Sequence, residues 1–136
     1  MEFIVRSKKP NDFIDITGEI VKFVRERKTE NGLCCVYAPH TTCGLALMEY
    51  EEGAVQDLKE TFGRLAPENG NYEHNITTHG GDQENGNGYA HVRAGLTRQS
   101  VCIPITDGEL ALGTWQSIVL IDFDGPRQRR VIVKII

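Results

Sequence analysis

Residues 107–136 read DGELALGTWQSIVLIDFDGPRQRRVIVKII, and this stretch decides the fold class. It contains three runs typical of β-strands, at 109–112, 115–123 and 130–136. A fourth strand is predicted at 100–105, and Asp107-Gly108 is a strong signal for a hairpin turn after it. Because no helical pattern separates these strands, we expect them to pair mostly antiparallel.

Strands and helices do not alternate regularly in the rest of the chain. Strands are predicted at 2–6, 33–38 and 41–48, amphipathic helices at 13–27 and 49–64, and a short helix at 89–96. Residues 66–88 are rich in Asn and Gly, and an irregular stretch of this length in a small domain is usually functional or disordered. The pattern predicts one α+β domain, 1–136, in which a mostly antiparallel sheet packs with two main helices.

The composition narrows the function classes. A formal net charge of −4 and a pI of about 5.5 argue against sequence-independent nucleic-acid binding, which needs many Lys and Arg contacts to phosphate. No apolar run approaches the ~20 residues that span a bilayer, and the N-terminus lacks the pattern of a secretory signal. The four cysteines form no C-x-x-C pair and are interpreted as reduced thiols. These features predict a cytoplasmic protein that binds neither nucleic acid nor membrane.

Polar residues that could take part in catalysis or binding are scattered along the chain. His40 follows a predicted strand and precedes the hydroxyls of Thr41 and Thr42, a position typical of catalytic or binding residues. A histidine that only caps a turn is an equal alternative. Glu49 ends the next predicted strand. Its carboxylate could act as a general base, orient a histidine, or simply be the acid at the N-terminus of the following helix.

The other histidines, His74, His79 and His91, lack the short spacing of a local zinc motif. Three imidazoles can still converge in the fold and leave a coordination position open for water or substrate. For His79, within THGGD, we prefer an exposed loop position without a role in chemistry.

Two further segments are candidates for substrate contacts. Trp115 and Gln116 place a flat ring beside an amide, an arrangement that can stack on a heterocycle and bind its edge, although a core Trp in a strand is equally consistent. The run 124–130 is locally basic, and its arginines Arg127, Arg129 and Arg130 can bind phosphate or simply occupy a solvated turn.

Taken together, these segments resemble the YjbQ-like family. The resemblance rests on HTT followed by an apolar run and Glu49, on Tyr72-x-His74, on AHVRAGL at 90–96, on DGELALGTWQ at 107–116 and on DFDGPR ending at Arg127. It extends from about residue 13 to residue 133. Members of this family carry the name secondary thiamine-phosphate synthase.

The resemblance implies a small α+β domain that assembles as a homotrimer. It implies a transferase that joins a pyrimidine-methyl pyrophosphate to a thiazole phosphate. The residues that it places in the site are His40, Glu49 and His91 for catalysis, Thr41, Thr42, Trp115, Gln116 and Arg127 for substrate binding, and His40, His74 and His91 as ligands of a divalent metal ion, Zn²⁺ or Mg²⁺.

Two other functions stay open. Three imidazoles and Glu49 would also suit a metal-dependent hydrolase or lyase that acts on a small anionic molecule. A non-catalytic trimer that holds a small molecule between subunits is the third possibility. The apolar character of residues 115–123 and 130–136 favours assembly, because it exceeds what a half-exposed strand needs. We therefore expect the site at or near a subunit boundary.

Overall fold

The computed structural model describes residues 1–136 and contains eight strands and four helices. In chain order these are β1 (Glu2–Arg6), β2 (Asp12–Asp15), α1 (Thr17–Arg27), β3 (Gly32–Tyr37), β4 (Cys43–Met48), α2 (Glu52–Leu65), α3 (Glu73–Thr78), α4 (Gly88–Leu96), β5 (Ser100–Thr106), β6 (Glu109–Leu110), β7 (Ser117–Asp122) and β8 (Gln128–Ile135). All strand pairs are antiparallel, so the predicted α+β class is confirmed.

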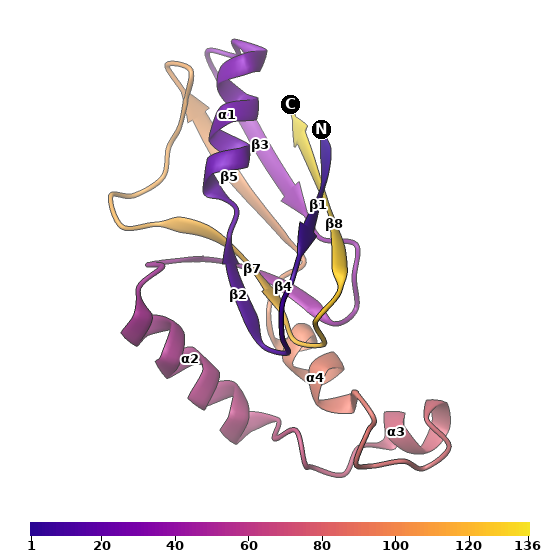
Figure 1. The fold of residues 1–136 in the computed structure, drawn as a ribbon. Helices are drawn as coiled ribbons and strands as arrows, with labels where there is room; N and C mark the ends of the chain where they lie inside the picture. The colour runs from indigo at the N-terminus through magenta and orange to yellow at the C-terminus, as the bar shows by residue number, and fades with distance from the viewer.

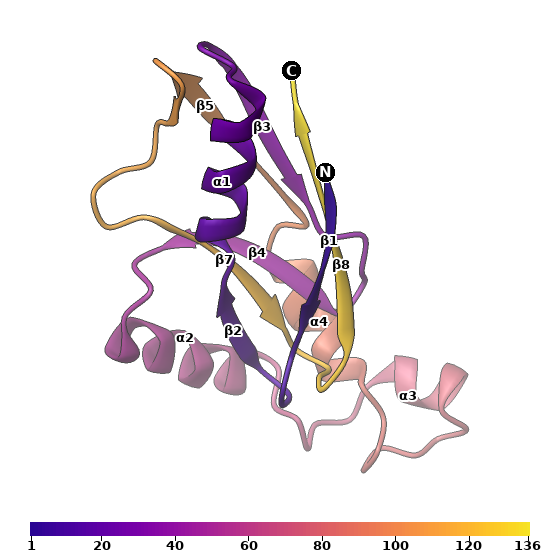
Figure 2. The same cartoon turned by 45° about the horizontal axis from the view of Figure 1, so that its top comes forward.

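The strands form two sheets rather than one. The larger sheet has the order β1-β8-β3-β5-β6, and the smaller has the order β2-β7-β4. Figures 1 and 2 show α1 beside the upper strands, α2 and α4 beside the smaller sheet, and α3 farther from both sheets. Both termini lie at the same end of the molecule, because β1 and β8 pair antiparallel.

Strand β7 separates two hydrophobic clusters. Ile118 and Leu120 face the larger sheet and α1, whereas Val119, Ile121 and Phe123 face α2 and α4. The chain itself therefore covers both faces of β7, which explains why its sequence is continuously apolar. This part of the apolar pattern gives no support for a covering subunit.

The predicted helix at 13–27 begins later than expected. Residues 12–15 form β2, in which Phe13 pairs with Ile121 and enters the cluster under α2 and α4. The Asp15 carboxylate then accepts hydrogen bonds from the backbone N–H and the hydroxyl of Thr17, which ends the strand and starts α1. A tertiary partner for Phe13 thus outweighs the helical spacing of the apolar residues.

Four other expectations need refinement. The predicted irregular stretch 66–88 contains the short helix α3, and the strand expected at 109–112 is limited to two residues. Glu51, not Glu49, is the acid at the start of α2, where its carboxylate accepts from the N–H groups of Gly53 and Ala54 at 2.6 and 2.9 Å. Trp115 lies in a turn rather than a strand and is 74% exposed.

The Asp107-Gly108 hairpin forms as predicted. Both residues have positive φ values, 51° and 78°, which the turns that best match strand twist require. None of the helices combines the length and the apolar character that crossing a membrane requires.

Candidate active site at the end of β3

A cavity of about 530 Å³ lies where β3 ends and α4 passes beside it. Residues 37–41, from the end of β3 and the loop that follows it, form one wall. His91 and Gly95 of α4, together with Gln99, form the other. The fold thus brings His40 and His91 into one cavity from positions far apart in the sequence.

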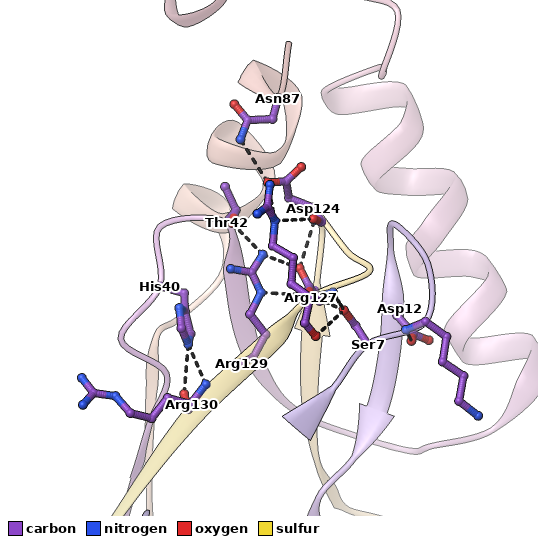
Figure 3. Close-up of polar contacts among 11 residues, drawn as sticks. Ser7, Asp12, His40, Thr42, Asn87, Asp124, Arg127, Arg129 and Arg130 are labelled. Atoms are coloured by element: carbon purple, nitrogen blue, oxygen red, sulfur yellow. Dashed lines mark hydrogen bonds and ion pairs between the residues drawn. The ribbon is translucent and has the colours of Figure 1, made fainter. Parts of the chain in front are cut away.

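The imidazole of His40 is anchored to the backbone of β8. Its Nε2 lies 2.9 Å from the backbone nitrogen of Arg130 and 3.1 Å from the carbonyl oxygen of the same residue (Figure 3). This contact occupies Nε2 and leaves Nδ1 as the ring nitrogen available to a ligand. Burial lowers the pKa of His40, and the nearby charge of Arg129 lowers it further, so the ring is neutral near pH 7.

A buried ion pair of Arg129 and Asp122 lies next to the His40 loop, where Arg129 contacts Thr42 (Figure 3). Arg129 donates from Nε and Nη2 to the Asp122 carboxylate at 2.9 and 2.7 Å, and its Nη2 also donates to the Thr42 hydroxyl at 2.9 Å. Ser7 donates to the same carboxylate at 2.6 Å. The network therefore ties the residue before β4 to the end of β7 and the start of β8, and it explains why Thr42 is buried rather than available to substrate.

Three of the four histidines gather beside α4. The ring of His74 lies 4.1 Å from that of His91 and 5.3 Å from that of His79, measured between centroids. Burial lowers the pKa of His91, and the neighbouring His74 lowers it further. No group of three His, Cys, Asp or Glu side chains is arranged to hold a metal ion. The predicted ligands His40, His74 and His91 thus do not form a ready metal cage within one chain.

Arg127 lies on the turn between β7 and β8, at the same end of the molecule. Its guanidinium pairs with Asp124 at 3.0 Å and is 55% exposed. Asp124 also accepts from the Asn87 amide at 3.1 Å, which connects this turn to the start of α4. His91 belongs to the same helix, so Arg127 lies on the side of the molecule that carries the imidazoles.

The remaining predicted residues lie at the other end of the smaller sheet. Met48 pairs with Ser117 at that end of β4, and Cys43 pairs with Asp122 at the end nearest His40. A six-residue strand separates the two ends by about 17 Å. Glu49 and the Trp115-Gln116 turn therefore lie away from the His40 cavity of their own chain. Gln116 is engaged locally, where its side-chain oxygen accepts from the Gly113 N–H at 2.8 Å.

The sequence interpretation missed Asp122, and it considered Arg129 only as one of the arginines that could bind phosphate, whereas the structure buries Arg129 against Asp122. A usable signal existed for Arg129, because the buried positions of β8 alternate and Arg129 precedes Val131 and Val133 in that alternation. A charged residue at an inward position of a strand indicates a buried partner. The partner's identity depends on the β7–β8 connection and was not visible in the spacing.

The two lowered histidine pKa values predict an acid-sensitive fold. A histidine in the unfolded chain has a pKa near 6.5, and folding lowers the pKa of His40 and His91 below that value. Below about pH 6.5 these two residues therefore bind more protons in the unfolded chain than in the folded protein, which favours unfolding. This contribution to stability is complete above that pH and is lost as the pH falls through the lowered folded values. We expect the urea concentration at the unfolding midpoint to decrease when the pH is lowered from about 7.5 to about 5. A His40→Gln/His91→Gln variant should lose less over the same range, and an equal loss would contradict the assignment.

Comparison with known proteins identifies relatives over the whole chain. The family model described as UPF0047 protein YjbQ-like matches residues 1–136. A UPF0047 protein of Archaeoglobus fulgidus is 42% identical over 134 residues, covering 98% of each chain. The UPF0047 protein YugU of Bacillus subtilis is 33% identical over 131 residues, covering 96% of this chain and 93% of YugU.

Solved structures agree with this relationship. A YjbQ/UPF0047 family protein of Clostridium acetobutylicum superposes with a TM-score of 0.87 at 35% identity, covering 100% of this chain and 99% of that one. A protein of unknown function from Sulfolobus solfataricus gives a TM-score of 0.90 at 27% identity, covering 99% and 94%. With fold, length and sequence all in agreement, this chain belongs to the YjbQ-like UPF0047 family.

Proposed function

We propose that this chain is a transferase with thiamine-phosphate synthase activity. In this reaction the bond between a pyrimidine-methyl carbon and a pyrophosphate oxygen breaks, and its electron pair leaves with pyrophosphate. The lone pair of a thiazole nitrogen forms the new bond to the same carbon. The observation that carries the proposal is the cavity that contains His40 and His91, with Arg127 on the same side of the molecule.

The cavity matches the needs of this substrate class. Its volume of about 530 Å³ lies within the range of roughly 300–1,000 Å³ that is usual for small-molecule sites. The developing charge on the leaving pyrophosphate needs preorganised donors. Neutral His40 and His91 each offer a ring N–H, the exposed Thr41 offers a hydroxyl, and the half-exposed Arg127 offers a guanidinium.

A divalent cation fits this proposal if it is bound mainly by the pyrophosphate of the substrate. Mg²⁺ is commonly held through substrate phosphates and only one or two carboxylates, so it needs no preformed cage of protein ligands. The proposed cation therefore arrives with pyrophosphate. His74 is then a neighbour of His91, with its ring 4.1 Å away, and it adds to the burial that lowers the pKa of His91.

The proposed active form is a homotrimer in which a second copy completes the site. Trp115 is 74% exposed and Leu96, one residue beyond the cavity-lining Gly95, is 60% exposed. Because Trp115, Gln116 and Glu49 lie away from their own His40 cavity, they can reach a cavity only in a neighbouring subunit. There the indole would stack on a substrate ring and exclude water.

A mixing experiment tests the shared site. We expect light scattering to give a trimer, and we expect His40→Ala and Trp115→Ala to be inactive alone. Mixed and reassembled in equal amounts, they should regain about a quarter of wild-type activity, because that share of sites pairs an intact His40 with an intact Trp115 from the next subunit. A monomer, or a mixture no more active than its components, would contradict the shared site.

A metal-dependent hydrolase or lyase is the second candidate. The observation that favours it is the contact of His74 with both His79 and His91. It requires tightly bound metal in protein purified without an affinity tag. Elemental analysis that finds less than one metal ion per site would contradict it without affecting the transferase proposal.

The direct test of the transferase is product formation. Purified protein, given both heterocyclic substrates and Mg²⁺, should release thiamine phosphate and pyrophosphate. Product no greater than that of a His40→Ala control would reject the activity. Tight binding of either substrate without turnover would instead support a non-catalytic binding protein.

A further inference from the structure

Two cysteines face each other across the larger sheet. Cys35 of β3 and Cys102 of β5 are register partners, and their Sγ atoms lie 2.7 Å apart. One thiol hydrogen is shared between them. The hydrogen bond with Cys102 raises the pKa of Cys35, and burial raises it further.

The backbone at this position suits a covalent link. Leu33 exchanges two hydrogen bonds with Ile136 next to β8, at 2.8 and 2.9 Å, while Ala38 donates to Gln99 toward β5 at 2.8 Å. Because hydrogen bonding alternates along a strand, Cys35 points its amide toward β8 and forms a non-hydrogen-bonded pair with Cys102. Such pairs bring Cα atoms to about 4.5 Å, inside the range of about 4.4–6.8 Å that disulfides adopt.

Exposure distinguishes this pair from the other two cysteines. Cys102 is exposed and Cys35 is half-buried, whereas Cys34 and Cys43 are buried. Burial raises the pKa of Cys34 to about 11 and that of Cys43 to about 12, so neither forms a thiolate readily. A dissolved oxidant therefore meets Cys102 first.

We propose that Cys35 and Cys102 are a reversible thiol–disulfide pair. A low-molecular-weight disulfide is the oxidant. The Cys102 thiolate attacks it, forms a mixed disulfide and releases one small thiol. The Cys35 sulfur then displaces the second small thiol and closes the bond between the strands. Two cysteine thiols and one small disulfide become one protein disulfide and two small thiols, and the cysteine protons pass to the departing thiolates.

The position of the pair gives the bond a structural consequence. Cys35 precedes Tyr37 by two residues, and Cys102 follows Gln99 by three, and both Tyr37 and Gln99 line the cavity. A bond between β3 and β5 would hold these two walls together. It would also restrict the unfolded chain, since the cysteines are 67 positions apart, so oxidation should raise the urea midpoint.

The test uses the full chain, incubated with oxidised glutathione and then quenched with acid. The wild-type protein should lose the mass of two hydrogen atoms, retain two of its four thiols after denaturation, and regain all four with dithiothreitol. Cys35→Ser should instead accumulate a glutathione adduct, because Cys102 reacts but has no partner. Cys102→Ser should form no internal bond.

Cys34→Ala is the matched control, since Cys34 is the sequence neighbour of Cys35 but faces the core. It should oxidise as the wild type does. Four thiols remaining in the wild-type protein, an internal bond that persists in Cys35→Ser, or a bond between chains on a non-reducing gel would each overturn the proposal.

Discussion

Replacing Arg129 by Met should destabilise the protein by about 3–5 kcal/mol, the largest effect that we expect from one substitution. Arg129 and Asp122 form a salt bridge of 2.7 Å in which the side chains are 8% and 0% exposed. Burial opposes ionisation of Asp122, but hydrogen bonds from Arg129, Ser7 and the Asp124 N–H outweigh it and lower the pKa of Asp122. Without Arg129, a buried negative charge loses its counterion. Urea unfolding at neutral pH measures the loss.

A double variant separates lost charge pairing from lost packing. Asp122→Asn alone leaves the buried charge of Arg129 uncompensated and should also be strongly destabilising. Asp122→Asn combined with Arg129→Met removes both charges, so the double variant should be more stable than the sum of the single effects predicts. Additive effects, or a loss below about 1 kcal/mol in either single variant, would show that the pair contributes little to the fold.

Replacing His40 by Ala should lower kcat/KM for thiamine-phosphate formation about 10²–10³-fold, the usual effect of removing one preorganised hydrogen-bond donor from a developing negative charge. The ring is neutral near pH 7, is held at Nε2 by the Arg130 backbone, and lines the cavity. His40→Gln separates chemistry from anchoring, because its amide can still bond to that backbone but supplies no imidazole. It should fold like the wild type and remain impaired.

His79→Ala is the matched control for that loss. His79 is an exposed imidazole outside the cavity, and its ring forms a hydrogen bond with the Asn87 side chain at 2.8 Å. Its removal should leave kcat/KM within a few-fold of the wild type. A comparable loss in His79→Ala, or full activity in His40→Gln, would contradict the role assigned to the His40 ring.

Local patterns predicted most elements because their signals lie within short windows. The apolar stripe of α2, the hairpin signal at Asp107-Gly108 and the dense apolar run of β7 each identified an element. Residues 13–15 were wrongly assigned to a helix, since the interaction that makes them part of β2 is the distant pairing with β7. The long segment 66–88 hid α3 for a similar reason. There Asn75 accepts from the Gly88 N–H at 2.9 Å, thirteen positions away.

The sequence by itself determined the α+β class, the family and the candidate side chains, because composition, periodicity and motifs are properties of the chain. Only the tertiary structure decided which of these side chains meet. It placed His40 and His91 in one cavity, and it placed Glu49 and Trp115 at the far end of β4. It also paired Arg129 with Asp122, and Cys35 with Cys102. These choices depend on strand order and register, which long-range pairing sets and local spacing does not encode.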